Sequence, residues 1–206
     1  MGDTMKKINI AVLVSGGGTN LQALIDAEKA GIIHSGNIKL VVSNNRDAYA
    51  LTRAKNNNIE TRVVLRSDYE SSRDFEAALI GVLKEAEIDM IVLAGFMSIL
   101  SPYFIGEFRD RIINVHPALI PSFCGKGFYG LHVHEAALEY GVKVTGATVH
   151  FVNEIPDGGK IILQKAVEVQ EGDTPEILQR RVMEQAEWII LPQATELVAA
   201  ELAERK

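Results

Sequence analysis

The sequence predicts an α/β protein with three layers, built on a doubly wound, mainly parallel sheet that has a mixed antiparallel C-terminal edge. Three observations lead to this fold class. Short apolar runs rich in β-branched residues alternate with helical patterns along most of the chain. A glycine-rich segment follows the first run, and two closely joined apolar runs stand nearer the C-terminus. This alternation is typical of βαβ units with helices on both faces of a sheet.

The individual elements follow from the spacing of the apolar residues. Seven strands are predicted, at residues 8–15, 38–44, 61–65, 90–95, 111–116, 144–152 and 160–169. Helices are predicted from about Asn20 onward and at residues 47–57, 72–86 and roughly 174–203. The last helix starts in "DTPEI", where Asp or Thr can cap it and Pro175 suits the first turn. The connection "NEIPDGG" is so short that the two strands it joins should run antiparallel.

Length and composition predict one globular domain. The chain has 206 residues, of which 47% are hydrophobic and 23% charged, and no repeat, low-complexity tract or linker divides it. We therefore expect a single domain over residues 1–206. Residues 1–5 are set apart from the domain as a candidate remnant of a cloning tag, because Met5 is a reasonable natural start.

Charge and cysteine content restrict the partners and the compartment. The formal net charge of -6 argues against nucleic acid as the main partner, although a small anionic ligand needs only local donors. Cys124 is the single cysteine and cannot form an intrachain disulfide, which favours a reducing cytoplasm. The longest apolar stretch, "IDMIVLAGFMSIL", is too short for a membrane span and contains Asp89. We expect a cytoplasmic protein with no membrane partner.

The glycine-rich segment "VSGGGTNLQAL" (14–24) lies between the first predicted strand and the first helix. Gly16 and Gly18 fit the start of a dinucleotide fingerprint, but Leu21 occupies its third glycine position. A nucleoside-triphosphate loop is excluded because no G-K-[ST] follows. The segment is either a plain tight turn or, as we favour, a site for one phosphate. The residues of that phosphate site would be Gly17, Gly18, Thr19 and Asn20.

A second polar cluster ends the predicted strand in "RIINVHPALIPSF" (111–123). Asn114 and His116 are two residues apart, so they point to the same side of the strand, which Pro117 then ends. Asp157, in the turn "PDGG", can reach the same crevice at the carboxyl ends of the strands. Asn can donate to an oxyanion, His can move a proton, and a nearby carboxylate raises the pKa of a histidine. This set suits nucleophilic addition to a carbonyl group.

The remaining histidines give weaker signals. His150, in "ATVHFV", is either a hydrogen-bonded core residue or a supporting residue of the same site. His132 and His134, in "GLHVHEAAL", are accompanied by neither H-E-x-x-H nor paired cysteines. We therefore expect no metal site.

Taken together, the motifs resemble those of the phosphoribosylglycinamide formyltransferase family of purine biosynthesis, from Lys6 to near the end of the chain. The resemblance rests on "VLVSGGGTNLQAL", "LAGFMSILSP", "NVHPALIPSF", "GLHVHEAALEYGV", "GATVHFV" and "PDGGKIILQ", in the family's order. It implies a formyltransferase-like variant of the Rossmann fold, with a phosphate-binding half (6–100) and a folate and catalytic half (101–206).

The resemblance also implies the reaction and its residues. The amine of glycinamide ribonucleotide would attack the formyl carbon of 10-formyltetrahydrofolate, a co-substrate, without a metal. The family's catalytic positions fall on Asn114, His116 and Asp157, and an acidic position on the amine-substrate side falls on Glu187. The folate-binding positions fall on Arg73, Met97, Ser98, Ile99, Leu100, Asn114, Asn153 and Glu154. The expected assembly is a monomer or a homodimer.

Two positions depart from the family pattern. By this resemblance, many relatives have arginine where Ser98 stands, so one folate contact is expected to differ. The resemblance also predicts one extra residue between Arg181 and Pro192, in the stretch that contains Glu187.

Three alternatives differ in testable ways. Methionyl-tRNA formyltransferases share the Asn-x-His-Pro core, but they add a C-terminal domain for which this acidic chain has no room. Formyltetrahydrofolate hydrolases add an N-terminal regulatory domain, with no room before Ile8. A catalytically silent module that binds a phosphorylated metabolite would explain the glycine loop but give Asn114, His116 and Asp157 no purpose.

Overall fold

The computed structural model describes residues 6–205, so the candidate tag remnant at residues 1–5 lies outside the described residues. The first half of the chain alternates strands and helices: β1 (Ile8–Val14), α1 (Thr19–Lys29), β2 (Gly36–Ser43), α2 (Tyr49–Asn56), β3 (Glu60–Val63), the 3₁₀ turn η1 (Arg66–Asp68), α3 (Ser72–Glu85) and β4 (Met90–Leu93). The second half contains α4 (Pro102–Glu107), β5 (Ile112–His116), α5 (Leu131–Tyr140), β6 (Val144–Phe151), β7 (Ile161–Glu168), α6 (Pro175–Val182), the π-helical turn η2 (Met183–Glu187) and α7 (Trp188–Glu204).

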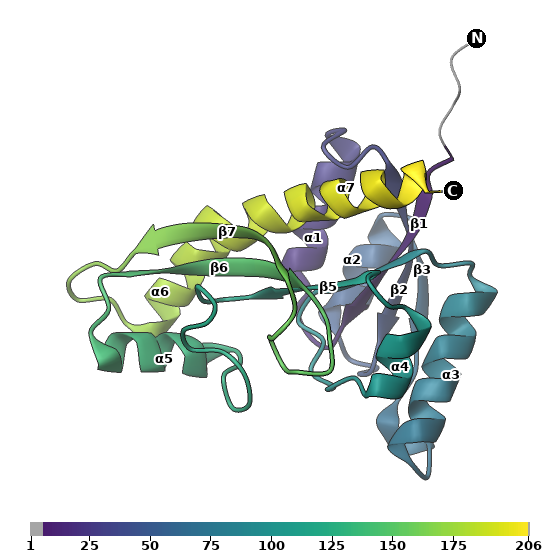
Figure 1. Ribbon diagram of the computed structural model, residues 1–206, viewed down its shortest axis with the longest axis horizontal. Helices are drawn as coiled ribbons and strands as arrows, with labels where there is room; N and C mark the ends of the chain where they lie inside the picture. The colour runs from purple at the N-terminus through teal and green to yellow at the C-terminus, as the bar shows by residue number, and fades with distance from the viewer. Residues whose placement is uncertain (1–5, 206) are drawn as a thin grey trace.

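The strands form one mixed sheet with helices on both faces, which confirms the predicted fold class (Figure 1). The strand order is β3-β2-β1-β4-β5-β6-β7. Strands β1 to β5 pair in parallel, while β6 runs antiparallel to β5 and β7 antiparallel to β6. The carboxyl ends of the parallel strands therefore meet at one edge, and β6 brings residues of the C-terminal half to the same edge.

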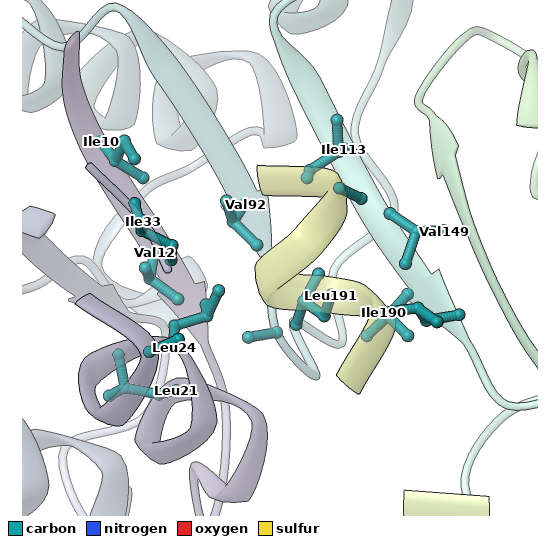
Figure 2. Packing of buried hydrophobic residues seen from close by; sticks show 14 of the residues in the cluster. Ile10, Val12, Leu21, Leu24, Ile33, Val92, Ile113, Val149, Ile190 and Leu191 are labelled. Carbon is teal, nitrogen blue, oxygen red and sulfur yellow. The ribbon is translucent and has the colours of Figure 1, made fainter. Parts of the chain in front are cut away.

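Alternate residues of the central strands build two separate cores. Ile10 and Val12 of β1 face one side of the sheet, where they pack with apolar residues of α1, α2, α6 and α7. Ala11 and Leu13 face the other side and pack with α3 and α4. Figure 2 shows the first core, with Leu191 and Ile190 of α7 beside strand residues such as Val92 and Ile113. Because both faces are covered, the central strands are apolar throughout.

Two of the helices were not predicted from the sequence. Helix α4 is only six residues long, with Pro102 in its first turn, so its apolar period is too short to recognise. Helix α5 contains His132 and His134, the two histidines of "GLHVHEAAL". Its helical signals are the buried pair Val133 and Ala137, four residues apart, and Gly141, whose φ of 79° ends the helix in the left-handed region.

The single C-terminal helix predicted at 174–203 is instead α6 and α7 joined through η2. Thr174 caps its start by accepting a hydrogen bond from the backbone N–H of Ile177, which decides between the two predicted caps. A π-helical turn takes up one residue more than a regular turn, and η2 lies between Arg181 and Pro192, where the sequence comparison with the family predicts one extra residue. Glu187 ends this turn, buried against α1.

Candidate active site

A large cavity opens at the carboxyl edge of the sheet. This main cavity has a volume of about 790 Å³. It is lined by Asn20, residues 95–99, 114–117 and 125–130, His134, Pro156, Asp157, Gln179, Met183 and Glu187. A side cavity of about 150 Å³ adjoins it and is lined by Leu93, Phe96, residues 98–100, Asn114, His150 and residues 152–157. Asn114 and Asp157 line both cavities, so they stand where the two meet.

The three predicted catalytic side chains lie together at this junction. Asn114 and His116 project from the same side of β5, and β6 places His150 opposite Asn114. The Asn114 amide Nδ2 lies 3.3 Å from His150 Nε2. Asp157 lies between the two histidines, with one oxygen 3.5 Å from His116 Nδ1 and the other 3.5 Å from His150 Nε2. His150 is buried and contacts both Asn114 and Asp157, so its position agrees with either sequence interpretation, a core residue or a supporting residue of the site.

Hydrogen bonds to the backbone fix how the two histidines point. His116 Nε2 donates to the carbonyl oxygen of Phe123 at 2.7 Å, which leaves Nδ1 facing Asp157. His150 Nδ1 donates to the carbonyl oxygen of Phe151 at 2.8 Å, so its Nε2 can accept from the Asn114 amide. An amide group has two N–H donors, and the second one of Asn114 remains for a ligand in the cavity.

Burial controls the electrostatics of this cluster. It lowers the pKa of His116, and this effect outweighs the Asp157 carboxylate and the Phe123 carbonyl, which both raise it. The expectation that Asp157 raises the pKa of His116 is therefore right for that contact, but the net shift is downward. Burial also opposes ionisation of Asp157, yet His150, the backbone N–H of Gly125 and His116 together hold the pKa of that carboxyl below its usual value. Asp157 is thus a carboxylate at neutral pH.

The glycine loop is held in shape by α2. Gly18 has a φ of 73° as the N-cap of α1, and a Cβ built on it would stand 2.6 Å from the Cβ of Ala50. Arg53 Nε donates to the carbonyl oxygen of Gly17 at 2.8 Å. Of the four predicted phosphate-site residues, only Asn20 lines the main cavity; Gly17 and Gly18 lead into α1, and Thr19, its first residue, lines a separate cavity of about 170 Å³.

Glu187 completes the side of the cavity that faces the loop. Its carboxylate accepts a hydrogen bond of 2.7 Å from Asn20 Nδ2, although the two residues are 167 positions apart. Burial raises the pKa of Glu187, against a smaller lowering by Asn20. This hydrogen bond places Glu187 beside Asn20, one of the four predicted phosphate-site residues.

Most of the predicted folate-binding residues line the two cavities. Met97 lines only the main cavity, and Leu100, Asn153 and Glu154 line only the side cavity, whereas Ser98, Ile99 and Asn114 line both. Ser98, where the sequence predicts a departure from the family pattern, accepts a hydrogen bond from Asn44. Arg73 lines neither cavity, and its guanidinium instead stacks over the ring of Tyr103, 4.5 Å from the centroid.

Sequence reasoning missed the part of the wall formed by residues 125–130, His134, Gln179 and Met183. His134 could have been found, because it stands between the buried helix positions of Val133 and Ala137. The loop carries no periodic signal. Within residues 6–205, no three His, Cys, Asp or Glu side chains gather in a way that could hold a metal ion. No helix in this described part of the chain is long and apolar enough to cross a membrane.

The fold and the site define a class of protein. An Asn, a His and a carboxylate meet at the carboxyl edge of a doubly wound sheet, near a glycine loop that can hold an anion. These are the features of an α/β enzyme that adds a nucleophile to a carbonyl group.

Comparison with known proteins identifies the family. Residues 8–195 match the formyl transferase family. The phosphoribosylglycinamide formyltransferase of Haemophilus influenzae is 44% identical over 188 residues, covering 91% of this chain and 84% of that protein. The chain therefore belongs to the formyl transferase family, in the branch of the phosphoribosylglycinamide formyltransferases, which confirms the resemblance seen in the sequence.

Longer relatives and solved structures agree with this assignment. The trifunctional purine biosynthetic protein adenosine-3 of Homo sapiens is 46% identical over 195 residues, or 95% of this chain. This chain spans 19% of the length of that relative, about a fifth. The crystal structure of glycinamide ribonucleotide transformylase 1 from Symbiobacterium toebii has a TM-score of 0.89 at 40% identity, covering 97% of this chain and 94% of that one.

Proposed function

We propose that this protein transfers the formyl group of 10-formyltetrahydrofolate to the amine of N1-(5-phospho-D-ribosyl)glycinamide, a step of purine biosynthesis. The observation that carries the proposal is the meeting of Asn114, His116 and Asp157 at the junction of the two cavities. One cavity reaches Asn20 and Glu187, and the other reaches residues 152–157. Two substrates entering from these two sides would meet at the catalytic cluster.

The amine substrate is assigned to the main cavity. Its phosphate would be held by Gly17, Gly18, Thr19 and Asn20, where the N-terminus of the 11-residue helix α1 favours an anion. Glu187, which bonds Asn20, is the group available to ribose hydroxyls on the same wall. The folate is assigned to Met97, Ser98, Ile99, Leu100 and the backbone of Asn153 and Glu154, with Arg73 as an outer contact.

In the proposed reaction the amine nitrogen attacks the formyl carbon, and a C–N bond forms as the carbonyl oxygen becomes an oxyanion. The free N–H of Asn114 donates to this oxyanion, and His116, when protonated, adds positive charge beside it. A proton then passes from the substrate amine to N10 of the folate. The bond between the formyl carbon and N10 breaks, which leaves formylated product and tetrahydrofolate.

The experiment that tests the proposal mixes purified protein with 10-formyltetrahydrofolate, with and without glycinamide ribonucleotide, and follows loss of the formyl group by absorbance. We expect loss only when the amine substrate is present. Loss without it would identify a hydrolase, and no loss at all would favour a silent binding module.

Location and assembly belong to the same proposal. We place the reaction in the cytoplasm, carried out by a monomer or a homodimer whose partners are the two small-molecule substrates rather than nucleic acid or a membrane. Sedimentation at working concentration distinguishes the two assemblies.

A further inference from the structure

His134 is a buried side chain that neither the fold nor the proposed mechanism explains. It lies in the first turns of α5 and is 0% exposed. Neither of its ring nitrogens has a hydrogen-bond partner among the described residues. Buried polar groups are nearly always bonded, because an unmade hydrogen bond is costly. An apolar residue of similar shape would fill this place in the fold at least as well.

The position of His134 indicates where its missing partners would come from. The side chain lines the main cavity, as do His116 and Glu187, and it does not line the side cavity. Helix α5 packs against α6, which contributes Gln179 to the same wall. His134 therefore belongs to the cavity that we assign to the amine substrate.

The protonation state of His134 suits a hydrogen-bonding role rather than a charged one. Burial, with a smaller effect of His116, lowers its pKa to about 4. At neutral pH the ring is uncharged, so one nitrogen donates and the other accepts. The polar amide chain of the amine substrate offers both kinds of partner.

We propose that His134 is a substrate-positioning residue, whose neutral imidazole hydrogen-bonds the glycinamide chain, directly or through one ordered water, and holds the attacking amine beside His116. This inference rests on the proposed function. The bound substrate would supply the hydrogen-bond partners that the two ring nitrogens of His134 lack in the free protein.

The variant His134→Phe tests the inference, with His132→Phe as matched control. Phenylalanine provides another aromatic ring without the two unpaired nitrogens, so we expect the melting temperature to stay the same or to rise. We expect kcat/KM for glycinamide ribonucleotide to fall about tenfold, the loss of one hydrogen bond, with KM for the folate unchanged. His134→Gln should recover part of the loss. His132 is exposed, pairs with Glu135 and does not line the cavity, so its variant should match the wild type.

Unchanged kinetics in His134→Phe, at an unchanged or raised melting temperature, would overturn the inference. A second measurement needs no variant: the ring ¹⁵N signals of His134 in labelled wild type should shift on addition of glycinamide ribonucleotide and not on addition of a folate analogue. Absence of that shift at saturation would also overturn it. If the wild type transfers no formyl group, the proposed function fails, while calorimetric binding of glycinamide ribonucleotide to wild type and His134→Phe still tests His134.

Discussion

His116 shows how single contacts set the chemistry of this site. Burial and the Asp157 carboxylate act on its pKa in opposite directions, and burial prevails. Asp157 is the larger of the two contacts that oppose this lowering, and the Phe123 carbonyl is the other. The sequence could place Asn114 and His116 on one face by strand alternation, but it carries no measure of burial.

Replacing Asp157 with Asn tests this balance. Without the carboxylate, the pKa of His116 should fall further, because only the Phe123 carbonyl then remains to raise it. If the protonated histidine is needed, the limb of the kcat/KM profile on which activity declines as pH rises should move to lower pH. A full pH profile of both proteins measures the shift. An unchanged profile would mean that Asp157 is a turn residue only.

Glu187 gives a second prediction at this scale. Asn20 Nδ2 donates to the buried carboxylate, while Asn20 Oδ1 has no partner. A glutamine at 187 could both accept from and donate to that amide, and it would remove a charge that burial disfavours. Because the pKa of Glu187 is raised in the folded state, stability is lost as pH rises through that pKa.

Glu187→Gln should therefore be more stable than the wild type at pH 8, by about 2–4 °C in melting temperature, with a smaller difference at pH 5. Its affinity for glycinamide ribonucleotide should fall. Thermal unfolding at the two pH values and calorimetry with the ribonucleotide measure both effects. A variant less stable than the wild type at pH 8 would contradict the account.

At the scale of elements, the turn between β1 and α1 depends on its fit against α2. Gly18 has positive φ and no room for a Cβ beside Ala50, whereas a Cβ on Gly16 would meet nothing within 4 Å. Gly18→Ala should thus cost about 1–3 kcal/mol of stability and weaken phosphate binding, while Gly16→Ala should be tolerated. Urea unfolding and inorganic phosphate titration compare the pair. Equal behaviour of the two variants would show that the loop is a plain tight turn.

The elements differ in how well the sequence predicts them. Regular elements with a clear period, such as β1, β5 and α3, were predicted to within a few residues. The π-helical turn η2 was not predicted, because apolar spacing does not distinguish one π-helical turn from a continuous α-helix. The loop at 125–130 takes its shape from contacts with distant groups, such as the bond from Gly125 N–H to Asp157, and no local pattern records these.

At the scale of the whole molecule, the topology explains why distant residues meet. The order β1-β4-β5 brings the carboxyl ends of three parallel strands together, and the antiparallel return of β6 places His150 opposite Asn114. Helix α7 packs on β1, β2, β6 and β7, and η2 before it carries Glu187 to the glycine loop. The alternation of strands and helices predicted this frame, which is why Asn114, His116 and Asp157 could be grouped before the structure was known.

We propose that Asn114 stabilises the oxyanion of formyl transfer. The turnover of the variant Asn114→Ala is the most direct test of this role. Turnover with both substrates should be measured together with dissociation constants for glycinamide ribonucleotide and a 5,8-dideaza folate analogue. Turnover should fall by about a hundredfold or more, because one donor to the oxyanion is lost, while both affinities stay nearly unchanged. Near-normal turnover would remove Asn114 from the mechanism and contradict the account.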